Sequence, residues 1–183
     1  MKKRNRCIIS GIAPYRISFG CNKESFEYRR TNVLLRNTIG TLHGHGVDEF
    51  YIDGSYGFPI WGGQIVISLM NDNDIMLYVA VPHENQAFCY TEEWRNEYYD
   101  VHRDCTQTIP IYLDFDIDGN REFLKEEYVM FERAAADFML RECGRLIFCG
   151  EPESDLPDSQ GCYIYEQAVE LGLKITKVAL PSI

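Results

Sequence analysis

Two patterns alternate along this chain: short runs of apolar residues, and longer stretches in which apolar residues recur every three or four positions. The short runs predict buried strands and the longer stretches predict helices. The predicted strands cover residues 7–10, 49–53, 75–81, 146–149 and 175–180, with one or two more between 109 and 117. The predicted helices cover 24–42, a segment through Trp61 and Ile67, a segment that Thr91 caps, 121–143 and 163–171.

Strands that alternate with helices predict βαβ units and a largely parallel sheet. Right-handed crossovers then place helices on both faces of the sheet. We therefore expect a single α/β domain over residues 1–183, a Rossmann-like three-layer domain with a mostly parallel sheet. Ligands of such folds bind at the carboxyl ends of the strands. Here those ends lead into the loops 11–20, 54–61, 82–86 and 150–163.

Composition and charge narrow the range of partners. The 183 residues are 45% hydrophobic and 25% charged, with a formal net charge of −10. This acidity disfavours binding to a nucleic-acid backbone or to an anionic membrane, and no apolar run is long enough to span a bilayer. Seven cysteines without a CxxC pair favour reduced thiols and a cytoplasmic location. An aromatic content of 13% is compatible with a homo-oligomer.

Three stretches carry a family resemblance. Residues 10–20 contain SGIAPYR and FG, similar to a TGHRP…FG turn. Residues 82–99 contain PHENQA, then Trp94 and a pair of tyrosines, similar to PxENQAxxW…YY. Residues 145–168 contain RLI and YIYEQA. In this order the stretches resemble the YpsA-like family, a branch of the SLOG superfamily of Rossmann-like proteins, over almost the whole chain.

The chain also departs from that family. The family's GxALGVDxWAAE turn is replaced by GSYGFPIWGGQ at 54–64, where Pro59 occupies the place of the Asp. The arginines of RNRYMVD are absent from 135–141, and the loop at 158–162 lacks a double glycine. The PGGxGTxxE signature of the Lonely Guy phosphoribohydrolases is absent. The resemblance therefore predicts the fold of this chain better than it predicts the chemistry of its ligand site.

The resemblance implies that the protein binds a nucleotide or nucleotide-derived small molecule, without a further cofactor, as a sensor or a sequestering protein. A bacteriophage or mobile-element origin fits such divergence. The glycine turn at 11–20 allows backbone to approach a phosphate, and Arg16 adds a planar cation. Tyr56 is placed to stack on a base, and Glu84 to hold ribose hydroxyls. The expected ligand-binding residues are Gly11, Pro14, Tyr15, Arg16, Gly54, Ser55, Tyr56, Pro82, His83, Glu84, Asn85, Gln86, Trp94, Ser159, Gly161 and Tyr163.

Each of these features also has a structural explanation. Arg16 can form a surface salt bridge, 54–57 can pack a strand tightly against a helix, and 82–86 can fix their own loop. Trp94 and Tyr98 share one helix face, and such aromatics are more often part of the core. We favour binding or loop structure over proton transfer at 82–86, because amides do not exchange protons near neutral pH.

Two other functions remain open. One is hydrolysis of the N-glycosidic bond of a nucleoside monophosphate or related compound, with Glu84 and Glu166 as the carboxylate pair that such chemistry needs. Pro59 at the family's acidic place weakens this alternative and favours binding without turnover. The other is a catalytically silent scaffold for protein interaction.

Two motifs are similar to metal sites but predict none. Residues 114–119 copy the start of an EF-hand loop, yet Lys125 stands where the bidentate Glu belongs. His43 and His45 have no nearby cysteine. We therefore expect a strand and turn at 114–119, and no metal ion.

Overall fold

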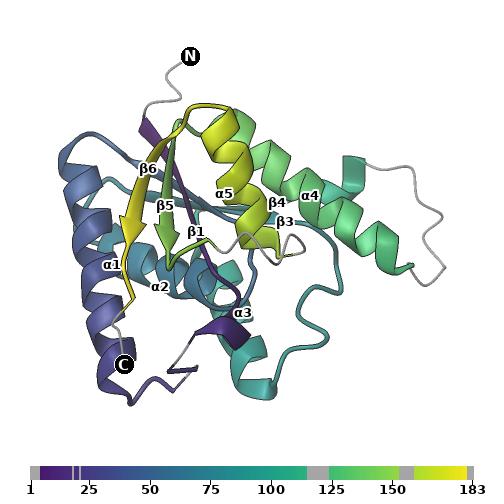
Figure 1. The fold of residues 1–183 in the computed structure, drawn as a ribbon, viewed down its shortest axis with the longest axis horizontal. Helices are drawn as coiled ribbons and strands as arrows, with labels where there is room; N and C mark the ends of the chain where they lie inside the picture. Colours follow the sequence, from purple (N-terminus) through teal and green to yellow (C-terminus); the bar gives the residue numbers. More distant parts are fainter. Residues whose placement is uncertain (1–4, 18, 21, 115–123, 153–158, 181–183) are drawn as a thin grey trace.

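Six parallel strands form the centre of the computed structural model, which describes residues 5–17, 19–20, 22–114, 124–152 and 159–180 (Figure 1). The strands are β1 (Arg6–Gly11), β2 (Glu49–Ile52), β3 (Met76–Val81), β4 (Gln107–Pro110), β5 (Arg145–Cys149) and β6 (Lys174–Val178). Their order across the sheet is β4-β3-β2-β1-β5-β6, and each neighbouring pair is parallel.

Helices cover both faces of this sheet. They are α1 (Phe26–Gly44), α2 (Phe58–Met70), α3 (Glu92–Asp104), α4 (Lys125–Glu142) and α5 (Gln160–Glu170), with short 3₁₀ turns η2 (Pro14–Arg16) and η3 (Ile111–Asp114). Helices α1, α2 and α3 pack side by side on one face, and α4 packs with α5 on the other (Figure 1). The predicted α/β class, three-layer arrangement and parallel sheet are confirmed.

The strand order reverses between β1 and β5. From β1 the chain adds β2, β3 and β4 on one side, and it then crosses to place β5 and β6 on the other. The loops that follow β1 and β5 therefore diverge, and they open a crevice at the carboxyl edge of the sheet.

Close packing of α2 sets the position of the loop that precedes it. A Cβ at Gly62 would lie 2.6 Å from Cγ2 of Ile9 on β1, and a Cβ at Gly63 would lie 2.9 Å from Cδ1 of Ile52 on β2. Only glycine at these positions lets the helix backbone lie this close to the sheet. The start of α2 is thereby held against the ends of β1 and β2.

The structure corrects two predicted boundaries. The strand expected between 109 and 117 is instead β4, which ends at Pro110 and passes directly into η3. Proline has no N–H for the ladder, which accounts for this end. The helix expected from 163 begins at Gln160, because the Ser159 hydroxyl accepts a hydrogen bond from the N–H of Cys162 (3.2 Å) and caps it. The remainder of the EF-hand-like stretch, 115–119, lies outside the described residues.

None of the helices within the described residues is long and apolar enough to cross a membrane. Six cysteines lie in this part of the chain, and no disulfide joins any two of them: Cys7, Cys89, Cys105, Cys143, Cys149 and Cys162.

Candidate ligand-binding pocket

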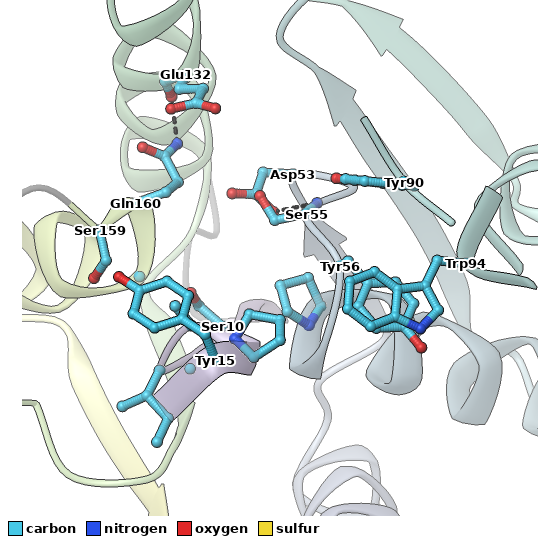
Figure 2. A pocket seen from close by; sticks show the side chains of 16 residues that line it. Ser10, Tyr15, Asp53, Ser55, Tyr56, Tyr90, Trp94, Glu132, Ser159 and Gln160 are labelled. Atoms are coloured by element: carbon cyan, nitrogen blue, oxygen red, sulfur yellow. Dashed lines mark hydrogen bonds between the residues drawn. The ribbon is translucent and has the colours of Figure 1, made fainter. Parts of the chain in front are cut away.

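A cavity of about 390 Å³ lies at the carboxyl ends of β1 and β2, next to the β1–β5 boundary where the strand order reverses. This volume is in the range of small-molecule sites. Its walls come from the β1 turn, the β2–α2 turn, the start of α3, the middle of α4 and the start of α5 (Figure 2). The lining residues are Ser10, Gly11, Ile12, Ala13, Pro14, Tyr15, Asp53, Ser55, Tyr56, Pro59, Tyr90, Trp94, Glu132, Ser159, Gln160 and Gly161.

The first turn of α5 lies directly against the end of β1. A Cβ on Gly161 would lie only 2.0 Å from the carbonyl oxygen of Gly11, so no side chain fits between the two backbones. Gln160 donates through Nε2 to the main-chain oxygen of Glu132, which ties this turn to α4. These contacts fix one polar wall of the cavity, formed by Ser159, Gln160 and Gly161.

Asp53 brings a buried carboxyl group to the end of β2. Its side chain accepts a hydrogen bond at Oδ1 from the N–H of Ser55 (2.9 Å), and its residue is only 2% exposed. Burial raises the pKa of Asp53 above its ordinary value, and hydrogen bonds from Ser55 and Gln160 oppose that increase. The residue is held in place by Gln86, whose Nε2 donates to the Asp53 main-chain oxygen at 2.8 Å.

Glu132 supplies a second carboxyl group from α4. Burial raises its pKa, the Asp53 charge raises it further, and Arg133 opposes both effects. The pKa of Tyr90 is also raised, first by burial and then by the charge of Asp53. The charge of Asp53 therefore makes both Glu132 and Tyr90 harder to ionise.

Aromatic rings form the opposite wall. Tyr56 stacks on Trp94 with ring centroids 3.8 Å apart and planes 9° apart. Tyr90 meets Tyr56 edge-on at 6.0 Å, and its hydroxyl donates to the Gly54 carbonyl at 3.4 Å. In Figure 2 these rings lie on the other side of the cavity from Gln160 and Glu132, with Asp53 between the two groups.

Tyr15 marks the rim. It follows β1 in the η2 turn, and 77% of it is exposed although it lines the cavity. A tyrosine ring left in water at the mouth of a cavity can gain contact area when a flat ligand enters. Figure 2 shows its ring on the same side as Ser159.

Half of the residues expected from sequence lie in the pocket wall. They come from the β1 turn, the β2–α2 turn, α3 and the start of α5: Gly11, Pro14, Tyr15, Ser55, Tyr56, Trp94, Ser159 and Gly161. The others do not line the cavity: Arg16, Gly54, Pro82, His83, Glu84, Asn85, Gln86 and Tyr163.

The loop after β3 supports the pocket from outside it. Gln86 is buried between Asp53 and α3, and its Oε1 accepts a hydrogen bond from the Tyr98 hydroxyl (3.4 Å). Pro82 and His83 are buried, whereas Glu84 and Asn85 are exposed. This placement agrees with the structural explanation of the stretch, in which the amide at Gln86 fixes a loop.

The carboxylate pair expected for hydrolysis is not brought together in the pocket. Glu84 follows β3 and Glu166 lies on α5, and both are exposed and outside the cavity wall. Tyr163 also faces away, since its hydroxyl donates to Asp137 (2.8 Å) and its ring lies 3.9 Å below the guanidinium of Arg133.

Sequence reasoning missed several wall residues, chiefly Ser10, Asp53, Tyr90, Glu132 and Gln160. Asp53 carried a usable signal, because a carboxylate that directly follows a predicted parallel strand lies at the ligand edge. Glu132 carried none, since its position depends on how α4 crosses the sheet.

Within the described residues no group of three or more His, Cys, Asp or Glu side chains has metal-binding geometry. His43 instead contacts Asp48, with Nδ1 3.4 Å from Oδ1. Comparison with known proteins adds no assignment: neither the family models nor the curated sequences contain a match to this chain.

Proposed function

We propose that this protein binds a nucleotide-derived small molecule in the β1–β2 pocket and acts as a sensor or as a sequestering protein. The observation that carries the proposal is that an aromatic wall and a polar wall lie opposite each other in one cavity. Stacked Tyr56 and Trp94 offer a flat apolar surface, and carboxyl, amide and hydroxyl groups lie opposite. The base of a nucleoside stacks on the aromatic surface, and the sugar hydroxyls form hydrogen bonds with the polar groups.

Two further points support this class of ligand. The cavity lies next to the reversal of strand order, which is where open α/β sheets bind their ligands. The resemblance of 10–20 and 82–99 to the YpsA-like family implies the same class. Binding without turnover agrees with Pro59 in the cavity wall at the place of a family acid.

The direct test is to denature the purified protein and identify what it releases by mass spectrometry, beside a thermal-shift screen of nucleosides, nucleotides, cyclic dinucleotides and ADP-ribose. A ligand at 100 times its Kd should stabilise the fold by about 2.7 kcal/mol. An intact nucleotide-derived molecule, or a shift of that size, supports the proposal. Nothing released and no shift would contradict it and favour the protein-interaction scaffold.

Substitution of Tyr15 localises the binding. We expect Tyr15→Ala to weaken the ligand found by this screen about tenfold, since loss of one stacking ring costs roughly 1–3 kcal/mol. Tyr99→Ala is the matched control, because Tyr99 is also an exposed tyrosine (56%) but lies on α3 outside the cavity wall. Equal affinities for both variants, measured by calorimetry, would place the ligand elsewhere.

A second candidate is N-glycosidic hydrolysis, which the two carboxyl groups in the cavity favour. In this reaction water adds its oxygen to the anomeric carbon, the carbon–nitrogen bond breaks, and the departing base nitrogen takes a proton. A protonated carboxyl is the donor and a carboxylate is the base for water. Asp53 and Glu132, rather than Glu84 and Glu166, occupy the pocket for these roles.

Release of free base, followed by chromatography, tests this candidate. Glu132→Gln and Asp53→Asn should each lower the rate by at least about a hundredfold, as expected on loss of general acid–base catalysis. Glu84→Gln and Glu166→Gln should retain it. If the wild-type protein releases no base from any nucleoside or nucleoside monophosphate, hydrolysis is wrong for those substrates and binding stands alone.

A further inference from the structure

We infer that the pocket selects an unphosphorylated nucleoside or nucleobase, bound through hydrogen-bond donors directed at Asp53 and Glu132, and that it rejects nucleoside di- and triphosphates. This inference rests on the proposed function and narrows its ligand class. The inference is based on the charged groups of the cavity wall and not on the shape of the cavity.

The wall contains two carboxyl groups and no lysine or arginine among its sixteen residues within the described part of the chain. Sites that take phosphate groups usually supply such cations, with Arg in particular binding phosphate oxygens in pairs. Three arginines are adjacent in sequence to wall residues, Arg16, Arg95 and Arg133, and none of them lines the cavity. The Arg95 guanidinium donates to the main-chain oxygens of Phe88 and Tyr90, and the Arg133 guanidinium lies over the ring of Tyr163.

The start of α5 gives only a weak attraction for an anion. A helix N-terminus carries about half of one positive charge. Here the Ser159 hydroxyl already accepts from the Cys162 N–H, and the Gly11 carbonyl oxygen lies close to Gly161. Two carboxyl groups in the same cavity outweigh this partial charge whenever they are ionised. Protonation of one of the two carboxyl groups would still leave the described part of this wall without a cation.

The same groups suit a neutral ligand that is rich in donors. Carboxylate oxygens accept hydrogen bonds from the amino groups of a base or from ribose hydroxyls. The Asp53 carboxyl lies between the aromatic wall and the α4–α5 wall (Figure 2). A base stacked on an outer face of the Tyr56–Trp94 pair would bring its polar edge, or its sugar, toward that carboxyl.

The test compares each common nucleoside with its 5′-mono-, di- and triphosphate by calorimetry on the full chain. We expect the preferred nucleoside to bind at least about tenfold more tightly than its triphosphate, because like charges close together in a partly desolvated site repel strongly. A triphosphate that binds as tightly as its nucleoside, or more tightly, would overturn this inference and leave the proposed function intact. If none of these compounds binds, this inference fails; if the cyclic dinucleotides and ADP-ribose of the screen do not bind either, the proposed function fails with it.

Glu132→Gln tests the cause. It removes one ionisable carboxyl group from the cavity at nearly constant shape, and it should reduce the nucleoside-to-triphosphate preference about tenfold. The control is Glu166→Gln, which changes the net charge equally on an exposed part of α5 outside the cavity. An equal loss of preference in both variants would mean that the net charge of −10, not the pocket, repels phosphates.

Discussion

His83 is a buried imidazole beside the pocket, and its surroundings are apolar. It is 6% exposed, its ring lies 4.7 Å from that of Tyr128, and Phe131 packs nearby. Among the described residues its Nδ1 has no hydrogen-bond partner. Burial lowers the pKa of His83 from 6.5 to about 4. The histidine is therefore neutral in the folded protein at neutral pH, and it contributes to packing rather than to charge.

This lowered pKa predicts a loss of stability in acid. In the unfolded chain His83 binds a proton as the pH falls below about 6.5. In the folded protein it binds that proton only as the pH falls to about 4. The contribution of neutral His83 to the free energy of unfolding is thus complete above pH 6.5. It falls by roughly 2 kcal/mol as the pH drops from 6.5 toward 4. His83→Phe, which suits the aromatic neighbours, should reduce the difference in unfolding free energy between pH 7 and pH 4.5 by that amount.

Urea unfolding of both proteins at the two pH values measures this difference directly. The carboxyls of Asp53 and Glu132 act in the opposite sense, because their raised pKa values favour the folded state in acid. They are present in both proteins and cancel in the comparison. An identical pH dependence for wild type and variant would contradict the role of His83.

At the scale of elements, the decisive contact is that between the start of α5 and the end of β1. Gly161→Ala would place a methyl group 2.0 Å from the Gly11 carbonyl oxygen, so the helix must shift or tilt. We expect a loss of roughly 2 kcal/mol in unfolding free energy, typical of overpacking, together with weaker ligand binding. Urea unfolding and calorimetry measure the two effects.

Gly40→Ala is the matched control within α1. Its Cβ would meet no atom within 4 Å, so the change should stabilise the helix by up to about 1 kcal/mol. A Gly161→Ala variant as stable as wild type would contradict this prediction, because it would show that α5 and the end of β1 can move apart at little cost. The pocket wall at Ser159 and Gln160 would then not depend on this contact.

At the scale of the whole molecule, the sequence predicted the alternating elements and the edge of the sheet where the pocket lies. Hydrophobic periodicity is a local property, and it located β3 and the cap at Thr91 well. The cavity wall depends on which distant elements meet. Trp94 was found through the motif resemblance at 82–99 and Ser159 through its place in a loop at that edge, whereas Glu132 lies within a helix whose crossing angle no local pattern encodes. Motif resemblance drew attention to Glu84, which proved to lie on the exposed side of its loop.

The pairing of β1 with β5 also has a consequence for biosynthesis. Gly11 pairs with Cys149, so the first strand made must wait for one of the last before its second edge is covered. Contacts between such distant parts of a chain form slowly. During translation β1 can join β2 and β3 early, but the crevice exists only after the C-terminal part has left the ribosome. A ligand of this pocket would thus stabilise chains in which β5 and α5 are already in place, and it would not stabilise shorter nascent ones.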